Sequence, residues 1–291
     1  MAALLIISLL LVSSLIHTFF YFDWKRAIKN GANPYFFFWL TGIWSIFLTT
    51  PIFLLFFAAT KINLYIIFLA FITGAGIALT TFFTSKAFVK GDFSLIYPLT
   101  RLTPLFALFV GVIFLKESLT TQSIAGILLV AAGIYTIHIK DYKHLLSPLS
   151  HIKEKSSLLA VLAAFTAKFY SLSSKLGSSL FNAFVFVYFS YIFMFICWLP
   201  VLFFKKSSIL LQIEKFSLPI MRVGTLDFIS YTLVTAAFAL GTLSEIVALR
   251  QMGVLFSSFA GIYFLKEKYG RFRIPASIMI FIGLALVVLS L

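Results

Sequence analysis

Four basic residues lie inside long apolar segments of the chain, apart from the lysines and arginines of the loops. Arg101 lies eight residues into an expected helix at 93–115, which places it about 12 Å along that helix. Arg250 has a similar place in a later segment, and Lys168 lies near the middle of another. If these segments cross a membrane, a lipid-facing cation costs about 3 kcal/mol, so we expect the three side chains to face water or a partner.

Few acidic residues lie in the same segments, namely Asp227 and Glu245. Arginine offers a planar, bidentate fork to a carboxylate or phosphate, so the positive excess predicts a site for an anion. The alternative is internal pairing, of Arg250 with Glu245 or of Lys168 with Asp227, which would hold helices in register. We favour substrate binding or gating for the cations and leave Asp227 between the two interpretations.

The fourth intramembrane cation and the histidines carry less information. Arg222 is near its expected helix start and is expected to extend to the membrane surface. His17 could relay protons because imidazole titrates near neutral pH, although packing is the commoner fate of a lone histidine. The remaining histidines, His138, His144 and His151, are loosely spaced without a cysteine and predict no metal site.

The chain offers no pattern for a cofactor or for catalysis. It has no glycine-rich phosphate-binding loop, which argues against ATP as the energy source. Its 9 acids and 4 histidines lie mostly in loops and form no convergent catalytic set. We therefore expect neither a cofactor nor an enzyme.

The composition determines which solvent surrounds these residues. The chain is 62% hydrophobic and 11% charged, with a mean hydropathy of +1.08, far from a soluble globular composition. Apolar runs of membrane-crossing length recur without the alternation of a β-barrel. We predict an all-α polytopic membrane protein with ten transmembrane helices, at about 2–22, 35–58, 63–87, 93–115, 120–139, 157–177, 181–204, 218–240, 243–265 and 273–290.

The net charge of +14 lies in particular loops. Connections after the odd-numbered helices hold 16 Lys and Arg, whereas those after the even-numbered helices hold three. This asymmetry is the positive-inside pattern of a cell (inner or plasma) membrane protein and gives no support for nucleic-acid binding. It predicts a multi-pass protein with extracytoplasmic termini and no removable signal peptide.

The chain repeats itself at an offset of 150 residues. Residues 87–117 and 237–267 match at 14 of 31 positions, and both copies end in Phe-Leu-Lys-Glu. An odd number of helices per copy turns the second copy upside down, so we predict two inverted five-helix repeats. The predicted boundaries are 1–140 for the first repeat, 141–156 for a central loop and 157–291 for the second repeat.

The segment around the first Phe-Leu-Lys-Glu resembles the pattern of EamA-type transporters of the drug/metabolite transporter superfamily. In that pattern a proline-containing helix leads to a glutamate, a polar turn and a glycine-bearing helix, filled here by Pro104, Glu117, Gln122, Gly126 and Gly133. The second copy keeps Glu267 and Gly283 but departs from the pattern at Val254, Phe272 and Ala276. The resemblance implies a ten-helix carrier with a central cavity. For Glu117 and Glu267, each beside a turn, we favour a structural or gating role, as a helix cap or a pair across the repeats.

Together these observations predict secondary-active transport, as export or exchange, of a small anionic or carboxylate-bearing metabolite by alternating access. We expect transport to be coupled to protons. The expected partners are the substrate and the lipid bilayer, and the expected assembly is a monomer or a homodimer. The alternative is a flippase for a lipid-linked anionic or amino-sugar head group. A membrane enzyme and a non-transporting partner subunit are more distant alternatives.

Overall fold

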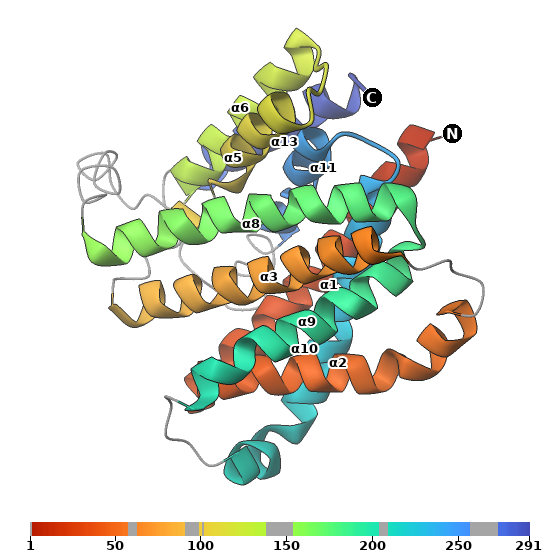
Figure 1. The fold of residues 1–291 in the computed structure, drawn as a ribbon. Helices are drawn as coiled ribbons and strands as arrows, with labels where there is room; N and C mark the ends of the chain where they lie inside the picture. The colour runs from red at the N-terminus through yellow and green to blue at the C-terminus, as the bar shows by residue number, and fades with distance from the viewer. Residues whose placement is uncertain are drawn as a thin grey trace.

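The computed structural model describes residues 2–57, 63–90, 99–100, 102–137, 154–203, 209–256 and 273–291. Ten helices have their bounds within these ranges: α1 (Ala2–Lys29), α2 (Pro34–Phe57), α3 (Leu64–Lys90), α5 (Thr103–Phe114), α6 (Thr121–Ile137), α8 (Lys155–Leu180), α9 (Ala183–Phe203), α10 (Ile209–Phe238), α11 (Leu243–Leu249) and α13 (Arg273–Val288). Residues 99–100 and 252–256 are also helical. Five of the described helices are long and apolar enough to cross a membrane. The predicted all-helical fold is confirmed (Figure 1).

Two helices extend further than their apolar runs. α1 continues to Lys29, past the predicted end at residue 22, so its last turns carry the first basic cluster. α10 begins at Ile209 instead of about 218, and its backbone departs from helical geometry at Phe216. Pro219 explains this kink, because a proline lacks the amide hydrogen and its ring crowds the carbonyl four residues earlier.

Two expected helices are interrupted in the middle. The helix predicted at 243–265 ends as α11 at Leu249, and helical geometry resumes at residue 252. At the break the amides of Gln251 and Gly253 bond to carbonyls three residues back, as in a 3₁₀ turn. The helix predicted at 93–115 begins anew as α5 at Thr103, with Pro104 in its first turn. The helices resume at Thr103 and at residue 252, which are 149 positions apart, so the repeats break at nearly equivalent places.

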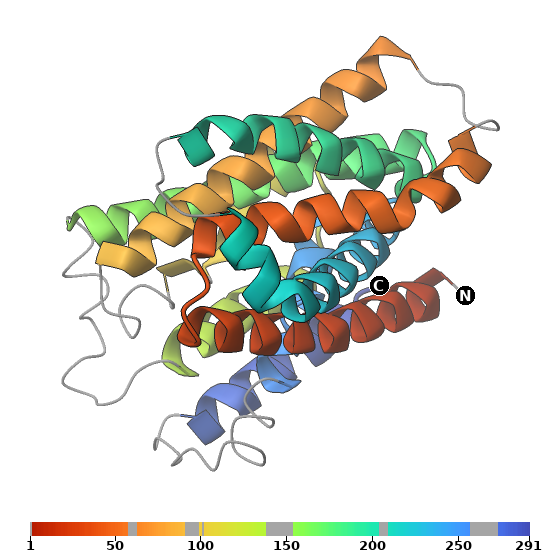
Figure 2. The same ribbon diagram turned by 90° about the horizontal axis from the view of Figure 1, so that it is seen from below.

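The helices pack mainly across the two repeats, in symmetric pairs. α3 lies against α8 and α9, just as α10 lies against α1 and α2 (Figure 2). Gly74 and Gly224, again 150 residues apart, allow these equivalent approaches: a Cβ at Gly74 would lie 2.5 Å from Ser190 O, and one at Gly224 would lie 2.5 Å from Thr41 O. Small residues at such crossings let two membrane helices come close together.

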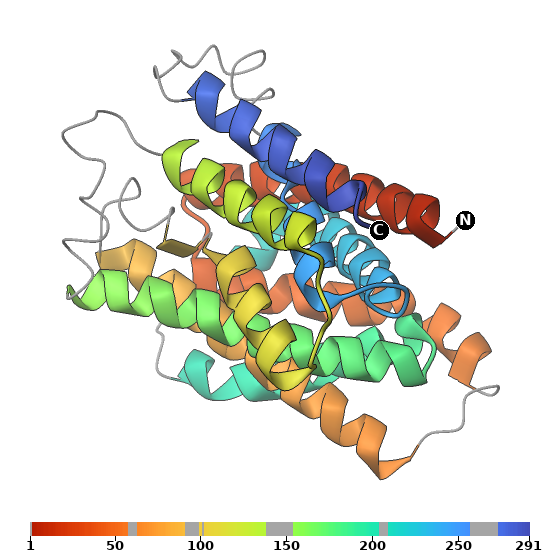
Figure 3. The same cartoon turned by 90° about the horizontal axis from the view of Figure 1, so that it is seen from above.

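The final helices of the two repeats pack closely against each other. α6 and α13 run side by side in Figure 3. A Cβ at Gly126 would lie 2.7 Å from the Gly283 carbonyl, and Gly283 meets the Gly126 carbonyl in the same way. Both chain ends lie at the end of the bundle that also holds the α8–α9 turn (Figure 1). We call it the terminal end.

Candidate functional site

A polar cluster lies among the apolar helices α8, α9 and α10. The hydroxyl of Tyr191 on α9 donates to Oδ2 of Asp227 on α10 at 2.6 Å. Tyr231, one turn further along α10, shares a hydrogen bond of 2.6 Å with Ser174 of α8. The Tyr231 ring lies 6.1 Å from that of Tyr191 and 6.3 Å from that of Tyr170. Tyr191 and Tyr231 are buried, whereas Asp227 is partly accessible. We call these five residues the tyrosine cluster.

Arg250 adds a positive charge beside this cluster. It ends α11 at the helix break, and its carbonyl accepts a hydrogen bond from Ser14 of α1 at 3.1 Å. Its charge acts on Asp227 and Tyr231, although no ion pair forms between these described side chains. Its Nε is buried and has no hydrogen-bond partner among the described residues. A buried charged donor without a partner is costly, so this atom is suited to receive a ligand oxygen.

The structure makes neither of the two internal pairs considered from the sequence. Asp227 accepts from Tyr191 instead of meeting Lys168. Glu245 accepts hydrogen bonds from Ser123 at 2.5 Å and Thr242 at 2.6 Å instead of meeting Arg250. Lys168 is buried on α8, with 7% of its surface exposed.

The other predicted residues lie apart from the tyrosine cluster. His17 stacks on Phe20 within α1, with ring centroids 5.4 Å apart and an interplanar angle of 8°. Arg222 is 61% exposed and pairs with Asp23 at 3.3 Å, near the end opposite the termini. Pro104 is buried in the first turn of α5. Five predictions lie outside the described residues: Arg101, Glu267, His138, His144 and His151.

A second polar cluster lies at the terminal end, around the start of α11. Glu117 accepts hydrogen bonds from the backbone amides of Leu243 and Ser244, although its own turn belongs to the first repeat. Lys175 of α8 donates to the carbonyls of Phe238 and Gly241, just before α11. This cluster therefore joins the repeats at the point where α10 turns into α11.

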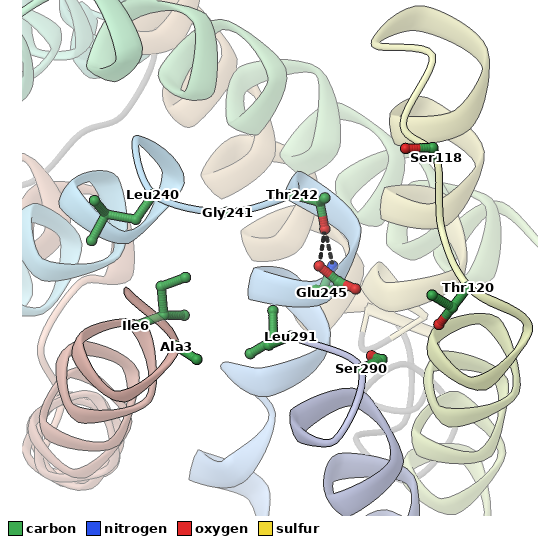
Figure 4. Close-up of a pocket in the computed structure, with 10 residues that line it drawn as sticks. All are labelled: Ala3, Ile6, Ser118, Thr120, Leu240, Gly241, Thr242, Glu245, Ser290 and Leu291. Carbon is green, nitrogen blue, oxygen red and sulfur yellow. Dashed lines mark hydrogen bonds between the residues drawn. The ribbon is translucent and has the colours of Figure 1, made fainter. Parts of the chain in front are cut away.

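A cavity of about 270 Å³ opens beside this second cluster (Figure 4). Glu245 and Thr242 face each other on its wall, and Thr120 and Ser290 line it from two other segments. The remaining lining comes from Ala3, Ile6, Ser118, Leu240, Gly241 and Leu291. Polar oxygen atoms thus line part of the space where the second repeat meets the chain ends.

Sequence reasoning did not find Tyr191, Tyr231, Ser174 or Lys175. A signal existed for the tyrosines, because a hydroxyl inside an apolar helix requires a partner. Asp227 was the natural candidate for that partner, but which tyrosine reaches it depends on helix packing. Lys175 is one of the three basic residues that the sequence assigned to the connections after even-numbered helices, whereas it belongs to the last turns of α8.

A family model agrees with this arrangement of two similar halves. The model of the EamA-like transporter family matches residues 4–139 and again residues 155–289. The chain belongs to the EamA-like transporter family. It is therefore a multi-pass membrane transporter and not an enzyme.

The fold of this EamA-like chain also occurs among solved structures. A crystal structure of a protein matches 99% of this chain and 98% of its own, with a TM-score of 0.69 at 16% sequence identity. At that identity the likeness concerns the fold alone. No curated protein sequence matches the chain significantly.

Proposed function

We propose that this EamA-like transporter is a secondary-active carrier that exports or exchanges a small carboxylate-bearing metabolite. The observation that carries this proposal is the buried Nε of Arg250, without a partner among the described residues, at the break that follows α11. Broken helices near the middle of a membrane are common places for substrate sites in carriers with inverted repeats. A guanidinium in such a place can bind a carboxylate through two parallel hydrogen bonds.

The tyrosine cluster supports a site that is selective in shape as well as charge. The Asp227 carboxylate faces the same region and would repel a simple anion unless part of the substrate is neutral or positive. Tyr191 offsets that repulsion by donating to the carboxylate. The proposed substrate therefore carries its carboxylate at Arg250 and a polar or aromatic remainder against the tyrosines.

Binding can be tested without knowledge of the natural substrate. Purified protein is screened for thermal stabilisation by small mono- and dicarboxylic acids, amino acids and phosphate esters. We expect some carboxylates to stabilise the protein and Arg250→Ala to abolish that effect while the variant stays folded. Arg222→Ala is the matched control, since Arg222 lies on the same helix as Asp227 but is exposed and pairs with Asp23 outside the cluster. Ligand stabilisation that survives Arg250→Ala would contradict the proposed site.

Coupling and orientation are parts of the same proposal. Uptake of the stabilising compound into proteoliposomes, with and without a pH gradient, tests the proposed proton coupling. Lipid scrambling without uptake would favour the flippase alternative instead. The proposed orientation puts the terminal end outside the cytoplasm, on the basis of the 16 to three count of basic residues. Protease access to a tag on either terminus in intact cells would test it.

A further inference from the structure

Glu117 belongs to the first repeat but completes a helix of the second. It lies in the connection between α5 and α6, and its two carboxylate oxygens reach the start of α11. One oxygen accepts from the amide of Leu243, and the other accepts from the amide of Ser244 at 3.2 Å and its hydroxyl at 2.6 Å. A carboxylate at a helix start satisfies amides that have no partner within the helix and meets the positive end of its dipole.

The backbone around Glu117 is shaped for this contact. Lys116 has φ of 53°, a left-handed conformation that non-glycine residues rarely adopt. This turn folds the chain back, so that the Glu117 amide bonds to the Gly111 carbonyl at 3.1 Å. A Cβ at Gly111 would collide with both the Glu117 carboxylate and the Ser244 hydroxyl. The strained backbone at Lys116 and the lack of a side chain at Gly111 both favour the contact of Glu117 with the start of α11.

The segment that enters α11 is held from a second side. Lys175 donates to the Phe238 carbonyl at 3.2 Å and also to the Gly241 carbonyl. Its positive charge acts on Glu117 and on Glu245, so the three charged groups interact. The α10–α11 turn therefore has its carbonyls bound by a lysine and its amides bound by a glutamate.

The contacts of Glu117 and Lys175 with the α10–α11 turn also restrict the position of Arg250. α11 contains seven residues and is therefore about 10 Å long, with Glu117 at its start and Arg250 directly after its end. A short helix moves as one body, so a constraint at Leu243 also limits where Arg250 can lie. α5 packs against α11, and the two repeats cannot separate here unless the Glu117 contact breaks.

We propose that Glu117 is a latch between the repeats, which closes the terminal end of the transport path and positions Arg250. This inference rests on the proposed carrier function, because only a carrier must open this end during its cycle. Release of the latch would free α11 from α5, so that the terminal end opens as the opposite end closes. Glu117 acts here through α11 and is a positioning residue.

The test compares two buried cysteine reporters and needs no substrate. The single native cysteine is first removed as Cys197→Ala. Val110→Cys reports on the α5–α11 interface, and Val223→Cys reports on the core towards the opposite end; both valines are 0% exposed. The rate of labelling by a small polar maleimide is measured in nanodiscs, where both ends are accessible. Each reporter is measured alone, with Glu117→Gln and with Gly111→Ala.

We expect both latch variants to raise labelling at Val110→Cys about five- to thirtyfold, the shift that loss of one helix cap produces. Labelling at Val223→Cys should not rise. Ser244→Ala removes the hydroxyl contacts with Glu117 and with the Ala107 carbonyl but keeps both amide contacts, so it should give a smaller increase. Glu214→Gln, an exposed glutamate on α10, should change neither rate.

Two outcomes would refute the proposal that Glu117 holds the terminal end closed. An unchanged rate at Val110→Cys would show that Glu117 does not hold this end closed. Equal increases at both reporters would show a general loosening, as expected if Glu117 only stabilises the fold. Because no ligand is involved, the labelling result can overturn the latch while carboxylate transport stands, and failure of the carboxylate screen would leave the labelling result unchanged.

Discussion

The equivalent glycines Gly74 and Gly224 allow a sharp test of the symmetric packing. In a helix, alanine is more favourable than glycine by about 1 kcal/mol, so Gly→Ala should stabilise wherever space allows. At Gly74 a Cβ would lie 2.5 Å from Ser190 O and 2.6 Å from Met194 N, and at Gly224 it would lie 2.5 Å from Thr41 O. These neighbours are backbone atoms that cannot rotate away, so two helices must move apart.

Overpacking of this kind typically costs 1–3 kcal/mol, from which the gain in helix propensity of about 1 kcal/mol is subtracted. We expect Gly74→Ala and Gly224→Ala each to lower the free energy of unfolding, by up to about 2 kcal/mol. The assay is unfolding by SDS titration in detergent micelles, followed by tryptophan fluorescence. Gly253→Ala is the matched control, because its nearest neighbour would be 3.4 Å away. Stabilisation by both core substitutions would refute the close approach of α3 to α9 and of α10 to α2.

Three further predictions concern polar groups. Tyr191→Phe removes the donor to Asp227 and should lower the free energy of unfolding by about 1 kcal/mol in the SDS titration, since water can replace a donor at a partly accessible carboxylate. Lys175→Met keeps the length of the side chain but leaves two carbonyls unsatisfied, so we expect the free energy of unfolding to fall by about 2 kcal/mol. A smaller fall than that of Tyr191→Phe would show that Lys175 does not hold the α10–α11 turn in place. Arg222→Ala breaks an ion pair whose arginine is 61% exposed and should cost less than about 1 kcal/mol; a larger loss in the melting curve would mean that the pair with Asp23 is structural.

Much of the architecture followed from hydropathy and from the repeat. Apolar runs of membrane length and the offset of 150 residues predicted a ten-helix, two-repeat fold, which the structure and the family both support. Ends and interruptions were harder to predict, because they depend on polar residues rather than on hydropathy. α1 continues through Asp23 and Arg26, and α11 stops at Leu249, directly before Arg250 and Gln251, within a segment that hydropathy predicts as one helix.

Site residues could be nominated from charge, but their partners could not. Arg250 and Asp227 stood out because ionisable groups inside apolar helices are rare. Glu117 stood out because the repeat marked it, yet nothing near it in the sequence pointed to Leu243 and Ser244, more than 120 residues away. Such contacts depend on how the two repeats cross, and that crossing is set by glycines such as Gly126 and Gly283.

The cross-repeat packing described above has a consequence for how the protein is made. α3 packs against α8 and α9, but Leu180 leaves the ribosome 90 residues after Lys90, a delay of about 5–20 s at ordinary rates of synthesis. During that time the surface around Gly74 has only lipid or insertion machinery to cover it. The helices of the first repeat therefore stay in the membrane without their packing partners until the second repeat is made. Biogenesis factors that shield small-residue surfaces should act at this stage.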